Sequence, residues 1–166
     1  MQHRWVVFMD LDGTVWDHLD VSITDPPYRK ISNDSIEDEK GVRLSLLPGA
    51  VDFVDWVRLN GGIISTCSWN IYDKAMGALV AFDIANKFDY HKISMSPRKD
   101  LAMEEIIRQL NGKGVKIENN LIFYLDDRDI HMKEIAARFP GLTFFHMWKK
   151  VRSFEEVKKK ISESIN

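Results

Sequence analysis

Cysteine is almost absent from this sequence, because Cys67 is the only one. A single cysteine excludes an intrachain disulfide and a cysteine-rich zinc cluster, which favours a cytoplasmic protein. Long apolar runs are absent too, since the longest stretch without a polar side chain, Ala75–Phe82, is far shorter than the roughly 20 residues that span a bilayer. The start of the chain meets a charge at Asp10, too early for a signal peptide. These absences argue against a membrane protein and a secreted, disulfide-stabilised domain.

An excess of charge of one sign is also missing. The chain has 23 Lys and Arg residues against 25 Asp and Glu residues, a net charge of −2, so no nucleic-acid or membrane-surface partner is expected. Internal repeats and low-complexity tracts are lacking as well. What remains is the composition of an ordinary globular domain, with 45% hydrophobic and 29% charged residues. A length of 166 residues predicts one domain, spanning 1–166 and large enough to bury its own core.

Short apolar runs alternate with amphipathic stretches along the chain. The runs predict buried strands at Arg4–Met9, Gly62–Cys67, Tyr90–Met95, Asn120–Leu125 and Leu142–His146. The amphipathic stretches predict helices at Pro48–Leu59, Asn70–Phe82, Lys99–Leu110, Asp129–Phe139 and Ser153–Ile165. This alternation predicts an α/β fold with a doubly wound, Rossmann-like parallel sheet and helices on both faces.

Residues 15–47 interrupt the alternation. Pro26 and Pro27 forbid a helix interior, and residues 42–46 alternate between apolar and polar side chains. We expect a small β-hairpin or flap, too short to form a large cap domain. Its aromatic side chains and Trp69 either line the opening of a site or pack the insert onto the sheet.

Polar side chains follow several of the predicted strands. They are Asp10 and Asp12 after the first run, Ser65 to Ser68 at the end of the second, and Asp126 and Asp127 after the fourth, with Lys99 opening the helix after the weak strand. Parallel strands end at one edge of a sheet, so these groups are expected to meet there. Taken one at a time, each acid is also typical of a turn or of a helix N-cap, and Lys99 is also typical of a solvent-exposed charge.

The charges of this group predict a divalent cation. Asp10, Asp12 and Asp127 bring three negative charges, which Lys99 offsets only in part. Two unit charges 4 Å apart interact by about 4 kcal/mol at an effective dielectric of 20, so such a cluster needs another cation. Oxygen ligands favour Mg²⁺, and the scattered histidines do not have the spacing of a zinc site.

These motifs, in this order, resemble the haloacid dehalogenase (HAD) superfamily of phosphatases. The resemblance rests on Asp10-Leu-Asp-Gly-Thr14, the hydroxyl after the second strand, Lys99 and the late acidic pair. Within the superfamily, Asp25-Pro-Pro-Tyr-Arg-Lys30 and Leu125-Asp-Asp127 are similar to the capless magnesium-dependent phosphatase-1 subgroup. The chain departs from the subgroup at two positions. The subgroup has Tyr where this chain has Gly13, the commoner residue in the wider superfamily, and Arg where this chain has Trp69.

The resemblance implies a role for each motif residue. Asp10 would attack phosphorus and carry an aspartyl-phosphate, and Asp12 would act as general acid and base. Asp10, the backbone carbonyl of Asp12, and Asp127 would hold Mg²⁺, with Asp126 beside them. Ser68, the backbone near Trp69, and Lys99 would bind the phosphoryl oxygens. The implied substrate is a phosphate monoester on a small molecule, such as a sugar, or on a phosphoprotein, such as phosphotyrosine.

Some alternatives remain at this point. Thr66 lies one strand period before Ser68 and competes with it as the phosphate-binding hydroxyl. A receiver-like or Mg²⁺-binding signalling module without turnover also uses an acidic cluster, a hydroxyl and a lysine, although its phosphoacceptor usually lies on a middle strand. A cysteine phosphatase is excluded, because Asp73 stands where the motif requires arginine.

Overall fold

The computed structural model describes residues 4–166. The predicted absence of a signal peptide concerns the start of the chain, of which residues 1–3 lie outside the described range.

A five-stranded parallel sheet forms the centre of the molecule, with strand order β6-β5-β1-β7-β8. Its strands are β1 (Val6–Met9), β5 (Ile63–Trp69), β6 (Tyr90–Ser94), β7 (Ile122–Asp126) and β8 (Thr143–His146). All five predicted strands are confirmed, and each lies within two residues of its predicted limits. The chain leaves β1 toward β5 and β6 and returns to its other side at β7, so the strand order reverses between β1 and β7.

Helices cover both faces of this sheet. They are α1 (Ala50–Leu59), α2 (Tyr72–Ala81), α3 (Lys99–Gly112), α4 (Met132–Arg138) and α5 (Phe154–Ile165), with short 3-10 turns at Val21–Ile23, Ala85–Lys87 and Asn119–Leu121. Successive side chains of β1 point to opposite faces, so Val7 and Met9 pack with α1, α2 and α5, whereas Val6 and Phe8 pack with α3 and α4. Because both faces of β1 are buried, every position of this strand is apolar, as is usual for a central strand of a parallel sheet.

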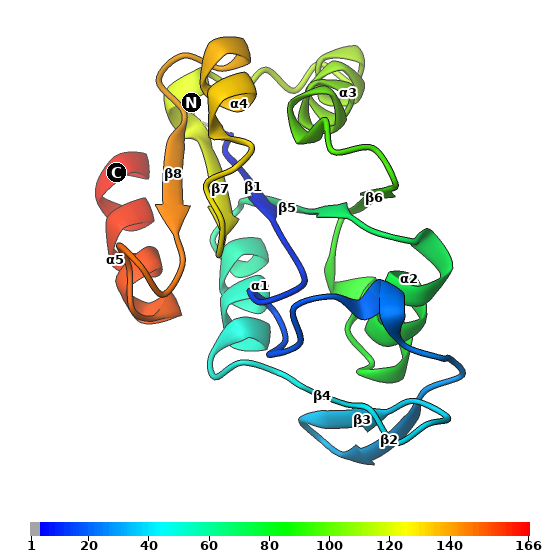
Figure 1. The fold of residues 1–166 in the computed structure, drawn as a ribbon. Coiled ribbons are helices and arrows are strands. Elements are labelled where there is room, and N and C mark those ends of the chain that lie inside the picture. The colour runs from blue at the N-terminus through cyan, green and yellow to red at the C-terminus, as the bar shows by residue number, and fades with distance from the viewer. Residues whose placement is uncertain (1–3) are drawn as a thin grey trace.

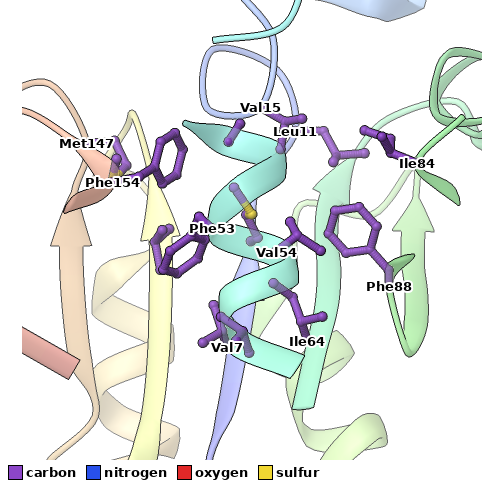
Figure 2. Close-up of a cluster of buried hydrophobic side chains, with 14 of the residues drawn as sticks. Val7, Leu11, Val15, Phe53, Val54, Ile64, Ile84, Phe88, Met147 and Phe154 are labelled. Atoms are coloured by element: carbon purple, nitrogen blue, oxygen red, sulfur yellow. The ribbon is translucent and has the colours of Figure 1, made fainter. Parts of the chain in front are cut away.

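The larger core lies between the sheet and α1. Figure 2 shows α1 across β1 and β5, with Val54 near Val7 and Ile64, and Phe53 on the side of Phe154. The rings of Phe53 and Phe154 lie 5.3 Å apart, which joins α1 to α5. This packing fixes the sheet whose strand ends carry the polar groups.

The insert forms its own antiparallel sheet, with strands β2 (Arg29–Ser32), β3 (Ser35–Glu37) and β4 (Arg43–Ser45). Figure 1 shows it as a projection at the opposite end of the molecule from α3 and α4. The prediction of a small insert without a large cap is confirmed. The insert is not a two-stranded hairpin, however, because it has three strands. β2 is exposed along its length and has no apolar alternation, so its sequence carries no strand signal.

Among residues 4–166, no helix has the length and apolar character needed to cross a membrane.

Candidate active site

Three carboxylates meet where β1 and β7 end. The backbone N–H of Asp10 donates to Leu125 O at 2.9 Å, which extends the pairing of β1 with β7 by one residue. Asp126 closes β7 and Asp127 follows it. One oxygen from each of these three acids lies within 4.8 Å of the others. The crevice where the strand order reverses is the usual ligand site of such sheets, and the predicted convergence of strand ends brings these acids there.

Lys99 joins the carboxylates from the first turn of α3. Its Nζ donates to Asp10 Oδ1 at 2.9 Å and to Asp126 Oδ2 at 2.8 Å. The Lys99 side chain is 2% exposed, so its interpretation as a surface charge is wrong. Its ammonium also lies 5.7 Å from the centre of the Tyr124 ring. The site therefore contains one buried cation among three acids.

Burial and the neighbouring charges shift the pKa values of these groups in different directions. Burial raises the pKa of Asp10 well above its ordinary value, although Lys99 acts against this. Burial also acts to raise the pKa of Asp126, but Lys99 and the hydroxyl of Tyr124 outweigh it and hold that pKa low. The pKa of Lys99 is raised, because Asp10 and Asp126 outweigh the effect of its burial. The ionised pair is thus Lys99 with Asp126, and Asp10 is a carboxyl that a further cation would help to ionise.

Hydrogen bonds occupy both oxygens of Asp126. Oδ2 accepts from Lys99 Nζ and from the Tyr124 hydroxyl, and Oδ1 accepts from the Arg128 N–H at 3.0 Å. Asp127 differs, because its Oδ1 is buried and has no hydrogen-bond partner among the described residues. Buried polar atoms are rarely left unpaired. Mg²⁺ prefers oxygen ligands, so an unpaired carboxylate oxygen beside two further acids is suited to bind such a divalent cation.

The carboxylate of Asp12 is directed to a different set of partners. It accepts hydrogen bonds from Trp16 Nε1 at 2.7 Å, from Asn70 Nδ2 at 2.8 Å and from the Val21 N–H at 3.2 Å. Burial nevertheless raises its pKa above the ordinary value. The side chain of Asp12 is not part of the group of three acids, so only its backbone is left to serve the predicted cation site.

The two candidate hydroxyls of β5 have different surroundings. Thr66 Oγ1 accepts a hydrogen bond from the Lys92 N–H at 2.9 Å, so this hydroxyl already bonds the neighbouring strand β6. Ser68 lies at the end of the strand, and its Oγ makes no hydrogen bond to another described residue. A cavity of about 250 Å³ lies beside the end of β5, and its lining includes Ser68 and Lys99 but none of the three acids.

Trp69 ends β5, next to Ser68. The residue is 44% exposed, and its Nε1 donates to Met95 O at 2.9 Å. It also meets the ring of His131 edge to face, with centroids 6.0 Å apart. Trp16, by contrast, is fully buried and stacks on Phe82, so it packs the start of the insert onto the body of the molecule. Cys67 is buried as a core thiol, and burial raises its pKa to about 12.

The hydrogen bonds that three residues make to the acids were not predicted from the sequence, although Trp16 was included in general terms among the aromatic side chains of the insert. Tyr124 holds Asp126, while Trp16 and Asn70 hold Asp12. Tyr124 lies two residues before Asp126, and this strand period, which puts both on one face of β7, is a signal that the sequence does contain. Asn70 has no comparable signal, because 58 residues separate it from its partner.

Several solved structures of other proteins have a similar arrangement of helices and strands. The N-terminal part of a Bacteroides fragilis protein, which contains a phosphatase domain and was solved with Mg, matches 99% of this chain with a TM-score of 0.65 and 18% identity. This chain spans only 40% of that one. A HAD-superfamily hydrolase from Ehrlichia chaffeensis matches over the full length of both chains, with a TM-score of 0.66 and 15% identity.

The HAD domain of the effector protein Lem4 from Legionella pneumophila is a further neighbour, with a TM-score of 0.64 and 13% identity over 99% of this chain and 95% of that domain. No protein-family model and no curated protein sequence matches the chain. The Ehrlichia and Legionella neighbours are both described as HAD proteins, and the motifs of this chain resemble the same superfamily. The chain has the α/β fold of the HAD-superfamily hydrolases.

Proposed function

We propose that this chain is a Mg²⁺-dependent phosphatase that hydrolyses phosphate monoesters. The proposal depends most on one observation: Lys99 Nζ bonds both Asp10 and Asp126, while Asp127 Oδ1 beside them has no partner among the described residues. Three carboxylates and one lysine leave two negative charges in excess when all are ionised. A divalent cation offsets that excess, and the cation and lysine together favour a phosphoryl dianion.

Asp10 is the proposed nucleophile. One of its oxygens would form a bond to phosphorus as the ester bond to the leaving oxygen breaks, which gives an aspartyl-phosphate. Asp12 would supply the proton that the leaving oxygen takes up. It would then take a proton from the water that attacks the aspartyl-phosphate, which releases inorganic phosphate and restores Asp10. The raised pKa of Asp12 suits a group that alternates between these two states.

The remaining residues would bind and orient the phosphoryl group. Asp10, Asp127 and the backbone carbonyl of Asp12 would hold Mg²⁺, which supplies Lewis-acid polarisation of the phosphoryl oxygens when it is bound. Ser68 and the backbone near Trp69 would donate to the phosphoryl oxygens from the side of β5. Lys99 would offset their charge while keeping Asp10 oriented through the 2.9 Å hydrogen bond.

Within this fold we place the chain beside the capless magnesium-dependent phosphatase-1 subgroup. The small size of the three-stranded insert supports this, because no large cap follows the first acidic motif. An uncapped site admits both phosphorylated small molecules and phosphoproteins, and we propose a substrate from these classes.

The test is hydrolysis of p-nitrophenyl phosphate by the purified chain with Mg²⁺, before and after addition of EDTA. Asp10→Asn removes the attacking oxygen's charge and should lower the rate by roughly a thousandfold or more. EDTA should stop the wild-type reaction, and added Mg²⁺ should restore it.

Asp83→Asn is the matched control, since Asp83 is an exposed acid in a left-handed conformation that Asn also tolerates. Its rate should equal that of the wild type. If folded Asp10→Asn keeps more than a few per cent of the rate, Asp10 is not the nucleophile. Labelling of Asp10 without repeated phosphate release would instead support a receiver-like module.

A further inference from the structure

The Asp12 carboxylate is held by donors from two separate parts of the chain. Trp16 and Val21 belong to the segment that directly follows Asp12. Asn70 comes from the end of β5, 58 residues away, and donates its side-chain N–H to Asp12 Oδ2 at 2.8 Å. Asn70 is therefore the residue that ties this carboxylate to the central sheet.

Asn70 is itself fixed in place and in orientation. It is 4% exposed, and its backbone N–H donates to Ser94 O at 2.8 Å across the neighbouring strand β6. Its side-chain Oδ1 accepts the Ile71 N–H at 2.9 Å at the start of α2. Since the oxygen of the amide faces Ile71, its NH₂ group faces Asp12. The amide orientation follows from these two bonds together.

The position of Asn70 also relates Asp12 to the phosphate side of the site. Asn70 lies two residues after Ser68, whose hydroxyl has no partner among the described residues. A carboxyl that must protonate a leaving oxygen has to lie at a set place relative to the bound phosphoryl group, because proton transfer requires hydrogen-bond reach. The hydrogen bonds of Asn70 to Ser94, Ile71 and Asp12 fix where this carboxyl lies relative to the end of β5 that carries Ser68.

We propose that Asn70 is a positioning residue that holds Asp12 where it exchanges protons with the leaving oxygen. This inference rests on the proposed phosphatase function. In the step concerned, an Asp10 oxygen bonds to phosphorus, the ester P–O bond breaks, and the proton of Asp12 passes to the oxygen that leaves. A misplaced Asp12 leaves that oxygen as an alkoxide, which is a poor leaving group, whereas p-nitrophenolate leaves without a proton.

The experiment compares kcat/KM for p-nitrophenyl phosphate and for an unactivated alkyl phosphate, because kcat/KM reports the step in which the ester bond breaks. General acid catalysis contributes about 100-fold to 10,000-fold. Asn70→Ala should therefore lower kcat/KM for the alkyl ester by at least roughly tenfold more than for the aryl ester.

A second variant separates the two bonds that the Asn70 side chain makes. Asn70→Asp keeps an oxygen for the Ile71 N–H but loses the donor to Asp12, so it should show the same selective loss on the alkyl ester. Asn60→Ala is the control, because Asn60 donates a comparable amide bond to Trp56 O at an exposed helix end. Asn60→Ala should change neither substrate's kcat/KM.

The outcomes separate this inference from the proposed function. If the wild type hydrolyses neither ester, the phosphatase assignment fails and this inference fails with it. If the wild type hydrolyses both, and the Asn70 variants lose activity equally on both, only the positioning role is wrong. Unfolding of both Asn70 variants would likewise overturn that role, because it would show that Asn70 serves the fold rather than Asp12.

Discussion

At the scale of single residues, Gly13 is the position most closely tied to the acidic cluster. Its φ of +71° lies in the left-handed region, and a Cβ placed there would be 2.4 Å from Asp127 Oδ2. Gly13 O also accepts a hydrogen bond from Trp148 Nε1 at 2.8 Å, so the turn cannot easily move away. A side chain at this position would therefore have to displace Asp127.

Gly13→Ala should weaken Mg²⁺ binding by roughly tenfold or more, because a displacement of even 1 Å degrades an octahedral site. The left-handed backbone should also cost about 1–2 kcal/mol of the free energy of unfolding. Calorimetric titration with Mg²⁺ and chemical denaturation measure the two effects separately.

Gly114→Ala is the control for backbone strain, since Gly114 has a φ of +80° and open space where its Cβ would lie. It should lose stability through its left-handed backbone alone and keep wild-type Mg²⁺ affinity. Equal Mg²⁺ affinities in the two variants would contradict the proposed contact between position 13 and the metal ligands.

At the scale of elements, an ion-pair cluster joins α3 to α4 beside Lys99. Asp100 is buried, and its carboxylate accepts from Arg98 at 2.9 Å on both oxygens and from Arg138 at 2.9 Å. Arg138 also bonds Glu104 at 2.6 Å. Because Asp100 follows Lys99 directly, this cluster anchors the turn of α3 that delivers the lysine to the site.

Asp100→Asn should lower the free energy of unfolding by about 2 kcal/mol at pH 7, because it breaks charge-assisted hydrogen bonds. Hydrogen bonds from Arg98 and Arg138 hold the pKa of Asp100 well below its ordinary value. A depressed pKa adds stability above the unfolded pKa of about 3.9, and this stability is lost as the pH falls toward the folded pKa. The difference in melting temperature between wild type and variant should thus narrow from pH 7 to pH 3.

Asp73→Asn controls for the helix dipole, because Asp73 is an exposed acid in the first turn of α2. Its melting temperature should differ little from that of the wild type at either pH. A difference between wild type and Asp100→Asn that stays constant down to pH 3 would show that the pKa of Asp100 is not depressed.

At the scale of the whole molecule, the site lies where two halves of the sheet meet. β1 lies between β5 and β7, and the acids come from its end and from the end of β7. A ligand that binds Asp10 and Asp127 therefore binds only the assembled sheet. Binding to the folded state alone stabilises it, by about 2.7 kcal/mol at a ligand concentration 100 times Kd.

We expect the melting temperature of the wild type to rise with Mg²⁺ concentration, whereas that of Asp127→Asn stays nearly constant. Without Mg²⁺ the variant should be the more stable of the two, since burial and Asp126 raise the pKa of Asp127 and disfavour its charge. Asp127→Asn should therefore have the higher melting temperature without Mg²⁺, and the wild type should have the higher one at saturating Mg²⁺. An equal rise in both proteins would place the cation elsewhere.

Much of this fold could be predicted because its signals are local. The apolar residues of β1 and β7 mark buried parallel strands within a few positions, and the acids that follow them mark the strand ends. β2 could not be predicted in this way. All four of its side chains are exposed, so no alternation distinguishes it from a loop.

Local patterns of residues are enough to identify the buried strands and the acids that follow them, because hydrophobic alternation and motif spacing involve only neighbouring residues. The hydrogen-bond partners of those acids, in contrast, are known only from the folded arrangement. Lys99 reaches Asp10 across 89 positions and Asn70 reaches Asp12 across 58. Such hydrogen bonds depend on the order of strands in the sheet, and that order is set by packing between elements, which no local pattern records.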